Sequence, residues 1–518
     1  MTEENVEVLV VGAGLAGLTA TMVLAQQGIR VLTVDRHPGT SIHPRASGQS
    51  SRTMELYRYA GIDRKVLGVS KRASQGLRIT IASSLNGKVL NRILEDLSEI
   101  DLDAATALPW GMAGQDVVEP VLLARAGELG ADVRFSTELV SFEQDDEGVT
   151  AVLSTGTVRA KYLVAADGGR SPVRRRLGVP TEGMGTIGQA IGVVFDADLG
   201  DRLQPDITDL YYLQHPRFTG ALVNTDIPGR FVFGTDLRPE NGDKVEDFTE
   251  DRVTELIRLA TDLPGLAPDI RWIGAWDIAA RVATKFRAGR VLLAGDAAKV
   301  TPPTGGMGGN TAVGDGHDVA WKLAAVLRGE AGPGLLDSYE AERKPFAEMV
   351  VNASLHNMKQ RMRTDLDLTG LPEPEDPIEL ALGYRCRSAA VVIDDDDPRP
   401  TENPNKPSGR TGFRAPHVPI TVDGLSMSTT DFFGHGWVLM TADPAWREAA
   451  ASARPVVTPR VLGEDFTAAD GLFTDRYGIG PGGATLVRPD GVVAWRTVRG
   501  VDDRTSVLSG VLDRVLCR

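Results

Sequence analysis

The sequence of 518 residues predicts a mixed α/β fold in three parts. A glycine triplet stands between a short apolar strand and a helix near the N-terminus, strand-like alternation runs through residues 185–280, and an acidic, proline-rich stretch precedes a last globular piece. We therefore place the first part at 1–180 and 281–390, an inserted antiparallel-sheet domain at 181–280, a linker at 391–410 and a C-terminal domain at 411–518.

Composition narrows the class of protein. With 42% hydrophobic and 24% charged residues the chain is globular, and a net charge of -14 without a basic stripe argues against nucleic acid or an anionic membrane as partner. We expect neither a signal peptide nor a membrane span, and hence a cytoplasmic protein. The two cysteines, Cys386 and Cys517, form neither a disulfide framework nor a metal-binding pattern, so we expect no metal. The oligomeric state stays open, with a homo-oligomer as one outcome.

The first element is a β-α-β unit. A strand over 6–11 runs into Gly12-Ala13-Gly14-Leu15-Ala16-Gly17, a helix follows to about Gln27, and a strand over 29–34 ends on Asp35 and Arg36. Glycines at this turn allow a pyrophosphate to approach the backbone at the helix N-terminus, and the carboxylate after the second strand can accept hydrogen bonds from a ribose. The unit is Rossmann-like and predicts dinucleotide binding, without distinguishing FAD from NAD.

The later elements follow in order. Short strands are predicted at 133–135, 149–153 and 158–164, and the sheet at 185–280 is a plausible substrate domain. A buried strand over 290–293 then leads into Gly295-Asp296, a glycine-rich run from Pro303 to Asn310, and a helix over about 315–327. Glycines leave room for a flat ligand to lie against the backbone. The free backbone N–H groups at the start of the helix can donate hydrogen bonds to an electron-rich carbonyl or a phosphate.

Several motifs together carry a family resemblance. They are Gly-Asp-Ala-Ala at 295–298 with the glycine run after it, Asp167-Gly168 with Ser171 and Arg174, the segments 44–46 and 52–56, and the pair Gln115 and Glu119. In this combination the sequence resembles the class A FAD-dependent aromatic hydroxylases over essentially the whole chain. Within that family it is most similar to bacterial enzymes that tailor aromatic polyketides such as anthracyclines and angucyclines.

The resemblance implies FAD as cofactor and a role for each matching residue. Gly12 to Gly17, Asp35 and Arg36 would hold the ADP half, and Arg45 and Gln115 the phosphate or ribityl region. Val140, at the end of a strand-like segment 135–140, would face the adenine. Asp167 would order the region shared by FAD and NAD(P)H, and Asp296 would hold the ribityl chain. The residues lining the isoalloxazine would be Pro303, Gly305, Gly306, Gly308, Gly309 and Asn310. Lys299 departs from the family, which has histidine there; the lysine would neutralise phosphate or point to solvent.

The resemblance also implies the reaction. NADPH or NADH, bound transiently, would reduce FAD, and a C4a-hydroperoxyflavin would hydroxylate an aromatic small molecule. No catalytic side chain is assigned beyond the flavin-facing loop at Pro303, Gly305 and Gly306. Polar and aromatic side chains of the predicted sheet are candidates for substrate contacts: Tyr212, His215, Asn224, Phe233 and Trp276.

Other functions stay open from the sequence. Baeyer–Villiger or antibiotic-inactivating oxidation uses the same scaffold, an NAD-dependent oxidoreductase without flavin is disfavoured by the two later motifs, and a flavin-free binding protein would purify colourless. The residues after about 405 resemble a thioredoxin-like domain, but that stretch holds one cysteine, Cys517, so dithiol chemistry is excluded. The sequence decides neither the substrate nor the choice of nicotinamide nucleotide.

Overall fold

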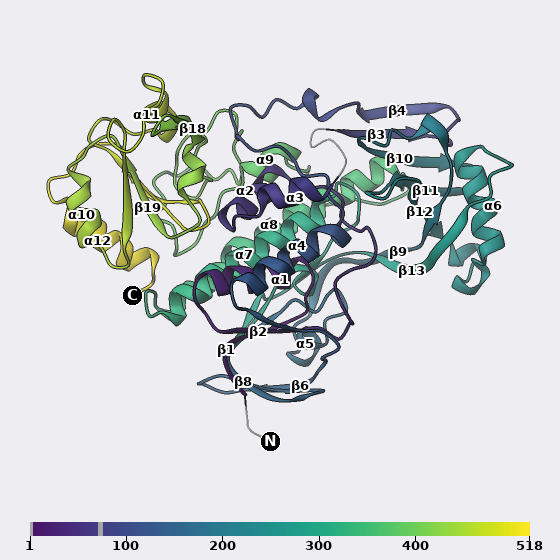
Figure 1. The fold of residues 1–518 in the computed structure, drawn as a ribbon, viewed down its shortest axis with the longest axis horizontal. Coiled ribbons are helices and arrows are strands. Elements are labelled where there is room, and N and C mark those ends of the chain that lie inside the picture. The colour runs from purple at the N-terminus through teal and green to yellow at the C-terminus, as the bar shows by residue number, and fades with distance from the viewer. Residues whose placement is uncertain (1–3, 71–75) are drawn as a thin grey trace.

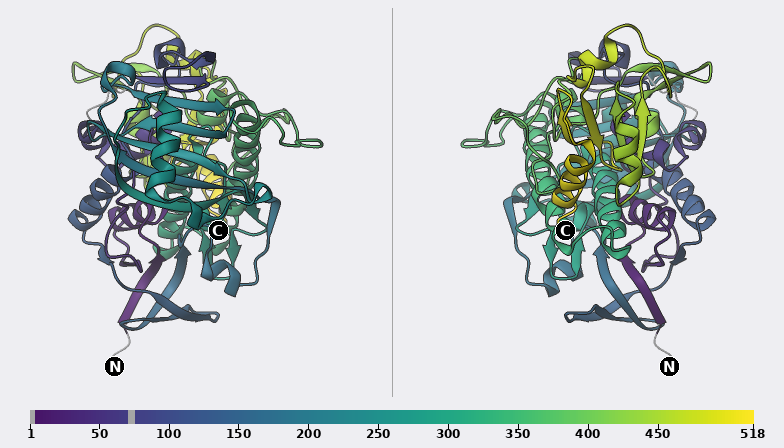
Figure 2. Two further views of the ribbon diagram at one scale, coloured as in Figure 1. Left: turned by 90° about the vertical axis from the view of Figure 1, so that its right-hand side faces the viewer. Right: turned by 90° about the vertical axis from the view of Figure 1, so that its left-hand side faces the viewer.

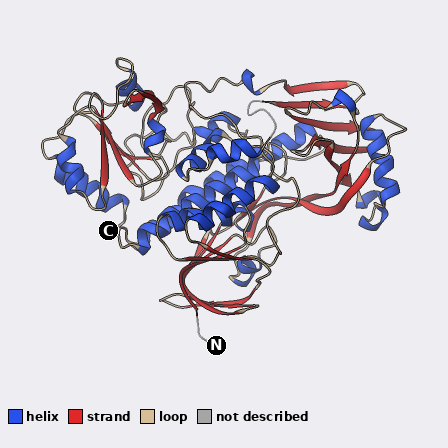
Figure 3. Ribbon diagram, in the orientation of Figure 1, coloured by secondary structure: helices blue, strands red, loops and turns tan. Residues whose placement is uncertain are grey.

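A computed structural model describes residues 4–70 and 76–518 of the chain (Figure 1). It contains two eight-stranded sheets, a four-stranded sheet and a two-stranded ribbon. Most of the long helices lie in the middle of the molecule, between the three main groups of strands, and the other helices lie at its periphery (Figure 3). The chain is therefore built around a central helical layer that every sheet meets along one side.

The first sheet has a parallel core with the order β15-β8-β1-β2-β5. Its strands are β1 (Glu4–Val11), β2 (Val31–Val34), β5 (Asp132–Arg134), β8 (Gly156–Ala165) and β15 (Val291–Leu293), with β6 (Leu139–Gln144), β7 (Val149–Leu153) and β14 (Arg287–Ala288) added antiparallel. The last four residues of β1 and all of β2 and β15 are buried, as expected for apolar parallel strands. The carboxyl ends of β1, β8 and β15 share one edge, and all three glycine or Asp-Gly motifs follow these ends.

Helices pack on this sheet and on one another. They are α1 (Leu15–Gln26), α2 (Ser51–Tyr59), α3 (Asp63–Val69), α4 (Gln115–Glu128), α5 (Pro172–Arg176), α7 (Met307–Leu327), α8 (Asp337–Arg361) and α9 (Pro377–Leu382). A Cβ at Gly316 would lie 2.3 Å from the carbonyl oxygen of Ala16, so α1 and α7 touch backbone to backbone. Helix α7 begins at Met307, earlier than the predicted 315, because this contact with α1 outweighs the low helix propensity of its glycines.

The second sheet has the order β16-β13-β9-β12-β11-β10-β3-β4. Its strands are β3 (Leu77–Ala82), β4 (Val89–Leu94), β9 (Thr181–Asp196), β10 (Thr208–His215), β11 (Phe218–Asn224), β12 (Arg230–Leu237), β13 (Asp269–Ala283) and β16 (Lys299–Val300). Strands β3, β4 and β16 lie outside the predicted range 181–280, and β10 pairs with β3 in parallel, so the sheet is not purely antiparallel. Helix α6 (Glu250–Thr261) covers its outer face (Figure 2, left).

The C-terminal region forms a separate β-α-β-α-β-β-α unit. Its elements are β19 (Trp437–Thr441), α10 (Trp446–Ser452), β20 (Val457–Val461), α11 (Leu472–Tyr477), β21 (Ala484–Val487), β22 (Val493–Thr497) and α12 (Arg504–Val515), preceded by the ribbon β17 (Pro419–Val422) and β18 (Leu425–Ser428). The sheet order is β20-β19-β21-β22, with β19 and β20 parallel and the other pairs antiparallel.

The acidic stretch predicted as a linker at 391–410 is not a free chain, because three of its four consecutive aspartates, Asp394, Asp395 and Asp397, are ion-paired. Both carboxylate oxygens of Asp395 accept hydrogen bonds from the fully buried guanidinium of Arg385, at 2.9 and 2.8 Å. Asp397 pairs with Arg410 at 2.8 Å, and Asp394 with Arg496. The segment therefore packs against the C-terminal domain through specific charge pairs.

None of the helices within residues 4–70 and 76–518 is both long and apolar enough to cross a bilayer. The predicted cytoplasmic location and the possible homo-oligomer stay predictions.

Candidate active site

The first glycine turn joins β1 to α1 and is closed by contacts that only glycine allows. Gly12 has a φ of +104°, and a Cβ there would lie 2.2 Å from the carbonyl oxygen of Ala166; a Cβ at Gly17 would lie 1.8 Å from the oxygen of Gly12. Helix α1 has no side-chain cap and no acidic residue in its first turn. Its N-terminal amides, which include those of the predicted residues Leu15 and Ala16, can therefore receive a phosphate.

Asp35 closes the same turn from the end of β2. Its Oδ2 accepts a hydrogen bond from the amide of Ala13 at 2.7 Å, and its Oδ1 accepts one from the amide of His37 at 2.8 Å. The neighbouring Arg36 is exposed. The carboxylate is thus held against the glycine turn at Ala13, and its contact with a ribose stays a prediction.

A second group of predicted residues lies on α4 and the loop that faces it. Glu119 is buried, and its carboxylate accepts hydrogen bonds from the Gln115 side chain at 2.6 Å and from the Ser41 amide at 2.7 Å. Burial raises the pKa of Glu119. The backbone N–H of Gln115 donates to the backbone carbonyl of Arg45 at 3.0 Å. The Arg45 side chain is exposed and has no ion-pair partner in the described chain. Arg45 is therefore available to an anion, and Gln115 acts partly as a brace for Glu119.

The middle motif lies directly against the first. Asp167 follows Ala166, which touches Gly12, and its Oδ2 accepts a hydrogen bond from the amide of Val173 at 3.1 Å. Its Oδ1 is buried and has no hydrogen-bond partner among the described residues, and burial raises the pKa of this carboxyl group. Arg174 donates to the carbonyl of Ala297 at 2.8 Å, which ties the middle motif to the third. A buried carboxylate oxygen without a partner is expected to receive one from a ligand or water.

The third motif completes the junction. Gly295 has a φ of +60°, and a Cβ there would lie 2.8 Å from the Cβ of Ala16, so this motif packs on the start of α1. Asp296 is exposed and its carboxylate has no hydrogen-bond partner within the described residues. The structure thus brings all three motifs together at the carboxyl edge of the first sheet.

Both roles predicted for Lys299 are wrong. Its side chain is buried, and its ammonium group pairs with Asp315. Asp315 also accepts hydrogen bonds from Arg343 at 2.8 Å and from the amide of Gly295 at 3.1 Å. The lysine therefore neither reaches solvent nor stands free for a phosphate; it belongs to a buried charge cluster beneath the third motif.

The glycine-rich run forms an exposed turn at the start of α7. Pro303, Gly305 and Gly306 are exposed, and the two glycines have φ values of +103° and +64°. Helix α7 has no side-chain cap and no acid in its first turn, so its N-terminal amides are free. A Cβ at Gly308 would meet the Thr301 methyl at 3.3 Å, which adds a packing reason for that glycine. The turn offers a bare backbone surface and a helix N-terminus to a flat, electron-rich ligand.

Asn310 and Gly309 tie this turn to the rest of the site. The Asn310 side chain accepts hydrogen bonds from the amide of Ser50 at 2.8 Å and the hydroxyl of Thr53 at 2.7 Å, and donates to the carbonyl of Gly306 at 3.0 Å. A Cβ at Gly309 would lie 3.0 Å from that of Ala46. Because its amide is occupied by protein partners, Asn310 positions the turn and α2 relative to each other.

Val140 departs from its predicted setting. The segment 135–140, predicted as strand-like, follows the end of β5: its residues 135–138 form a bend and a loop, and only its last two residues belong to β6. Val140 is the second residue of β6 and its side chain is 63% exposed. The adenine contact predicted for it stays a prediction.

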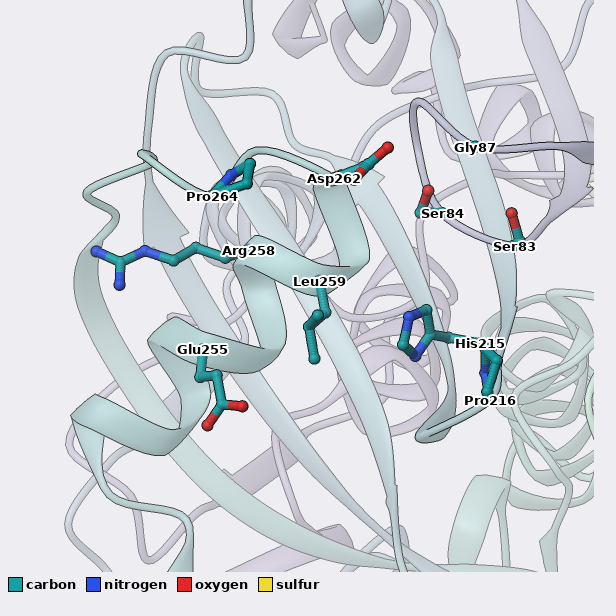
Figure 4. Close-up of a pocket in the computed structure, with 10 residues that line it drawn as sticks. All are labelled: Ser83, Ser84, Gly87, His215, Pro216, Glu255, Arg258, Leu259, Asp262 and Pro264. Atoms are coloured by element: carbon teal, nitrogen blue, oxygen red, sulfur yellow. The ribbon is translucent and has the colours of Figure 1, made fainter.

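Three of the five substrate candidates lie on the outer face of the second sheet, where α6 packs, and are corrected here. Phe233 is fully buried in the core beneath α6, and the Asn224 side chain donates to the carbonyls of Gln204 and Ile207 at 2.9 and 2.7 Å. His215 lines a surface pocket of about 440 Å³ between α6 and the loop at 83–87 (Figure 4). Because side chains alternate along a strand, His215, Asn224 and Phe233 all belong to the outer face. Tyr212 and Trp276 lie on the inner face.

Two residues of α8, Asn357 and Arg361, were missed by the sequence interpretation. A Cβ built on Gly305 would lie 2.9 Å from the amide nitrogen of Asn357, so this side chain borders the glycine turn. Arg361 donates to Asn357 at 2.9 Å, and its guanidinium carbon lies 5.7 Å from the centre of the Tyr212 ring. Its Nε is buried without a partner in the described part of the chain. The spacing of four residues puts both on one face of a helix, but no sequence motif marks them.

Comparisons with known proteins agree with this geometry. Residues 5–354 match the family model described as FAD binding domain, and residues 408–518 match the one described as aromatic-ring hydroxylase, C-terminal. The chain is 52% identical over 471 residues to aklavinone 12-hydroxylase of Streptomyces peucetius (89% of this chain, 96% of the relative), and 47% identical to that of Streptomyces purpurascens over the full length of both. A solved structure of aklavinone-11 hydroxylase with FAD and aklavinone matches all of both chains at 46% identity, with a TM-score of 0.95.

Proposed function

Because this chain belongs to the FAD-dependent aromatic-ring hydroxylases, we propose that it hydroxylates a fused-ring aromatic polyketide of the aklavinone type. The observation that carries the proposal is the position of Arg361 and Tyr212 on the inner face of the second sheet. They are connected through Asn357 to the glycine turn that would face the flavin. Full-length likeness to a hydroxylase whose structure holds aklavinone supports the same substrate class.

The residues at the junction of the three motifs fit FAD. The unpartnered Oδ1 of Asp167, the free carboxylate of Asp296 and the uncapped N-termini of α1 and α7 are groups that a dinucleotide with hydroxyls, phosphates and carbonyls would satisfy. We assign the ADP half to residues 12–17 and Asp35, and the isoalloxazine to the turn at 303–309. When bound and reduced by a nicotinamide nucleotide, FAD would activate O₂, so that one oxygen atom enters the ring and the other leaves as water.

The chain's own residues prepare the substrate. A guanidinium with a free, buried Nε favours the ionised form of a phenol placed against it, because an opposite charge stabilises the anion. Phenolate character raises the electron density of the ring that receives oxygen. Asn357 holds this guanidinium by a hydrogen bond of 2.9 Å, so the charge is fixed relative to the glycine turn.

We also propose NADPH or NADH as a transient reductant, supported by the lack of a second glycine fingerprint in the sequence. For the C-terminal domain we propose a thioredoxin-like fold without redox function. The β-α-β-α-β-β-α order and the mixed sheet β20-β19-β21-β22 support the fold. The two cysteines are both unpaired and one of them is buried, which supports our proposal that this domain has no dithiol redox function.

Substrate-stimulated oxidation of NADPH tests the proposed function. The purified yellow protein is assayed with anthracyclinones, angucyclinones, simple phenols and rifamycins, and the products are examined for an oxygen atom derived from heavy-isotope O₂. We expect a fused-ring phenol to accelerate NADPH oxidation and to gain one labelled oxygen. If no compound raises the rate above that of the enzyme alone, the assigned substrate class is wrong. A lactone or ester product would replace hydroxylation by Baeyer–Villiger chemistry.

A further inference from the structure

One row of paired residues crosses the inner face of the second sheet. Tyr212 of β10 pairs with Ala221 of β11, Ala221 with Gly234 of β12, Gly234 with Gly192 of β9, and Gly192 with Gly274 of β13. Directly paired residues on neighbouring strands point to the same side of a sheet. The residues next to these in sequence, such as Phe233, point to the opposite face of the sheet and are buried under α6. The row from Tyr212 to Gly274 therefore lies on the inner face, away from α6.

Two tryptophans explain the glycines at one end of the row. A Cβ at Gly192 would lie 2.2 Å from Cζ3 of Trp276, and a Cβ at Gly274 would lie 2.1 Å from Cζ2 of Trp272. The two indoles therefore rest directly on the backbone of β9 and β13. The exposed fraction of Trp276 is 37%, so its ring is only partly covered by protein.

Gly234 has no such packing reason. Its φ is not left-handed, and a Cβ there would meet a single described atom within 4 Å, Cη2 of Trp276 at 3.8 Å, which is ordinary contact. Its neighbour in the row is Ala221. The middle of the row therefore carries no side chain larger than the methyl group of Ala221, and at Gly234 only the edge of the Trp276 ring comes within 4 Å of the space that a Cβ would take.

Polar and aromatic groups stand at the ends of this bare stretch. Tyr212 is at one end with the Arg361 guanidinium beside its ring, and the buried Nε of Arg361 has no partner among the described residues. Trp276 is at the other end. The three strand spacings from β10 to β9 give a width of roughly 14 Å. That width admits several fused flat rings, while substituents rising from the ring plane would meet the sheet.

We propose that Ala221 and Gly234 form a bed for the planar fused rings of the substrate, bounded by Tyr212 and by the exposed indole of Trp276, and that Gly234 selects flat fused-ring substrates. The inference rests on the proposed function and adds the residues that decide substrate shape. Offset or edge contacts with an indole favour an extended aromatic system over a single ring.

Substitution of Gly234 by leucine tests the proposal. The side chain would fill the space above the bed, so the dissociation constant for aklavinone, measured by titration of the ligand's visible absorbance against the flavin-loaded protein, should rise at least tenfold. Trp276→Leu should weaken aklavinone binding more than binding of a one-ring phenol. Ala275→Leu is the matched control, since Ala275 is exposed beside Trp276 and pairs with Ile191 on the outer face. It should bind like the wild type.

The outcomes separate this inference from the proposed function. If wild-type protein neither binds nor hydroxylates any fused-ring phenol, the proposed function fails and the bed fails with it. If the wild type binds and hydroxylates aklavinone, and Gly234→Leu binds it with unchanged affinity, the bed is refuted while the function stands. Flavin content and the thermal midpoint of each variant are measured alongside. If Gly234→Leu is misfolded, Gly234→Val and Gly234→Ala decide: affinity falling with side-chain size supports the bed, and equal affinity overturns it.

Discussion

Replacing Arg488 by methionine should destabilise the folded chain by about 3–5 kcal/mol, the usual cost of breaking a buried ion pair from one side. Arg488 is fully buried where the C-terminal domain meets the central helices. It donates to both carboxylate oxygens of Glu342 on α8, at 2.6 and 2.9 Å, and to both of Asp490, at 3.0 and 2.5 Å. Asp318 of α7 lies 3.6 Å away.

The magnitude follows from what remains after the substitution. Glu342 keeps the ammonium of Lys322 at 2.8 Å and the hydroxyl of Ser388, but Asp490 loses both of its guanidinium hydrogen bonds. Four charge-assisted bonds at about 1.5–3 kcal/mol each would sum to more, yet they share one guanidinium and are not additive. The single-sided value of about 3–5 kcal/mol is therefore the expected loss.

Urea unfolding, followed by circular dichroism and by tryptophan fluorescence, measures this loss; both probes are needed because the chain has several domains. Arg217→Met is the control, because its ion pair with Glu255 is more than half exposed and should contribute about 0–1 kcal/mol. The double variant Arg488→Met with Glu342→Gln should lose less than the sum of the two single variants. A loss for Arg488→Met no larger than that of the control would refute the reasoning.

Three further predictions concern the cofactor, the substrate and pH. Asp296→Ala should be purified with much less flavin, read from the ratio of flavin to protein absorbance, since its free carboxylate is assigned to the ribityl chain; a full complement would contradict that role. Arg361→Met should move the pH dependence of substrate hydroxylation to higher pH by about 1–3 units, because the phenolate loses its cation, and Arg361→Lys should restore part of it; unchanged profiles would remove Arg361 from the chemistry. Burial lowers the pKa of His417 to about 4. Since the unfolded imidazole binds a proton below about pH 6.5 and the folded one only near pH 4, its contribution to stability is complete above pH 6.5 and falls as the pH drops through this window. His417→Gln should therefore give a flatter fall in urea midpoint between pH 6.5 and 4, and parallel curves for variant and wild type would contradict the assignment.

Local sequence patterns correctly predicted the N-terminal β-α-β unit and the family of the protein. The β-α-β unit at the N-terminus was predicted because its strand, glycine turn and helix are neighbours in the chain, and helix α1 ends within a residue of its predicted end. The resemblance on the Asp167-Gly168 and Gly295-Asp296 motifs identified the family, which the comparisons confirm. Short-range spacing suffices for such features because the turn chemistry itself dictates the residues.

Features that depend on distant segments were predicted less well. Tyr212 and His215 were predicted together as substrate contacts, although they lie on opposite faces of β10. The sequence did not show which face of the sheet α6 would cover, so His215 and Phe233 were assigned to the wrong side. Arg361 carried no motif, since its role comes from a long helix that crosses from the glycine turn to the second sheet.

The sequence by itself determined the glycine turns and the identity of several strands, because those depend on backbone conformations that a few adjacent residues impose. FAD as the cofactor followed from the resemblance of its motifs to a known family. Only the tertiary structure decided that Lys299 is buried against Asp315, that three of the four aspartates at 394–397 are ion-paired, and that Gly234 lies between Tyr212 and Trp276. Each of these depends on which charges or surfaces a distant segment brings within a few ångströms, and no local pattern encodes that choice.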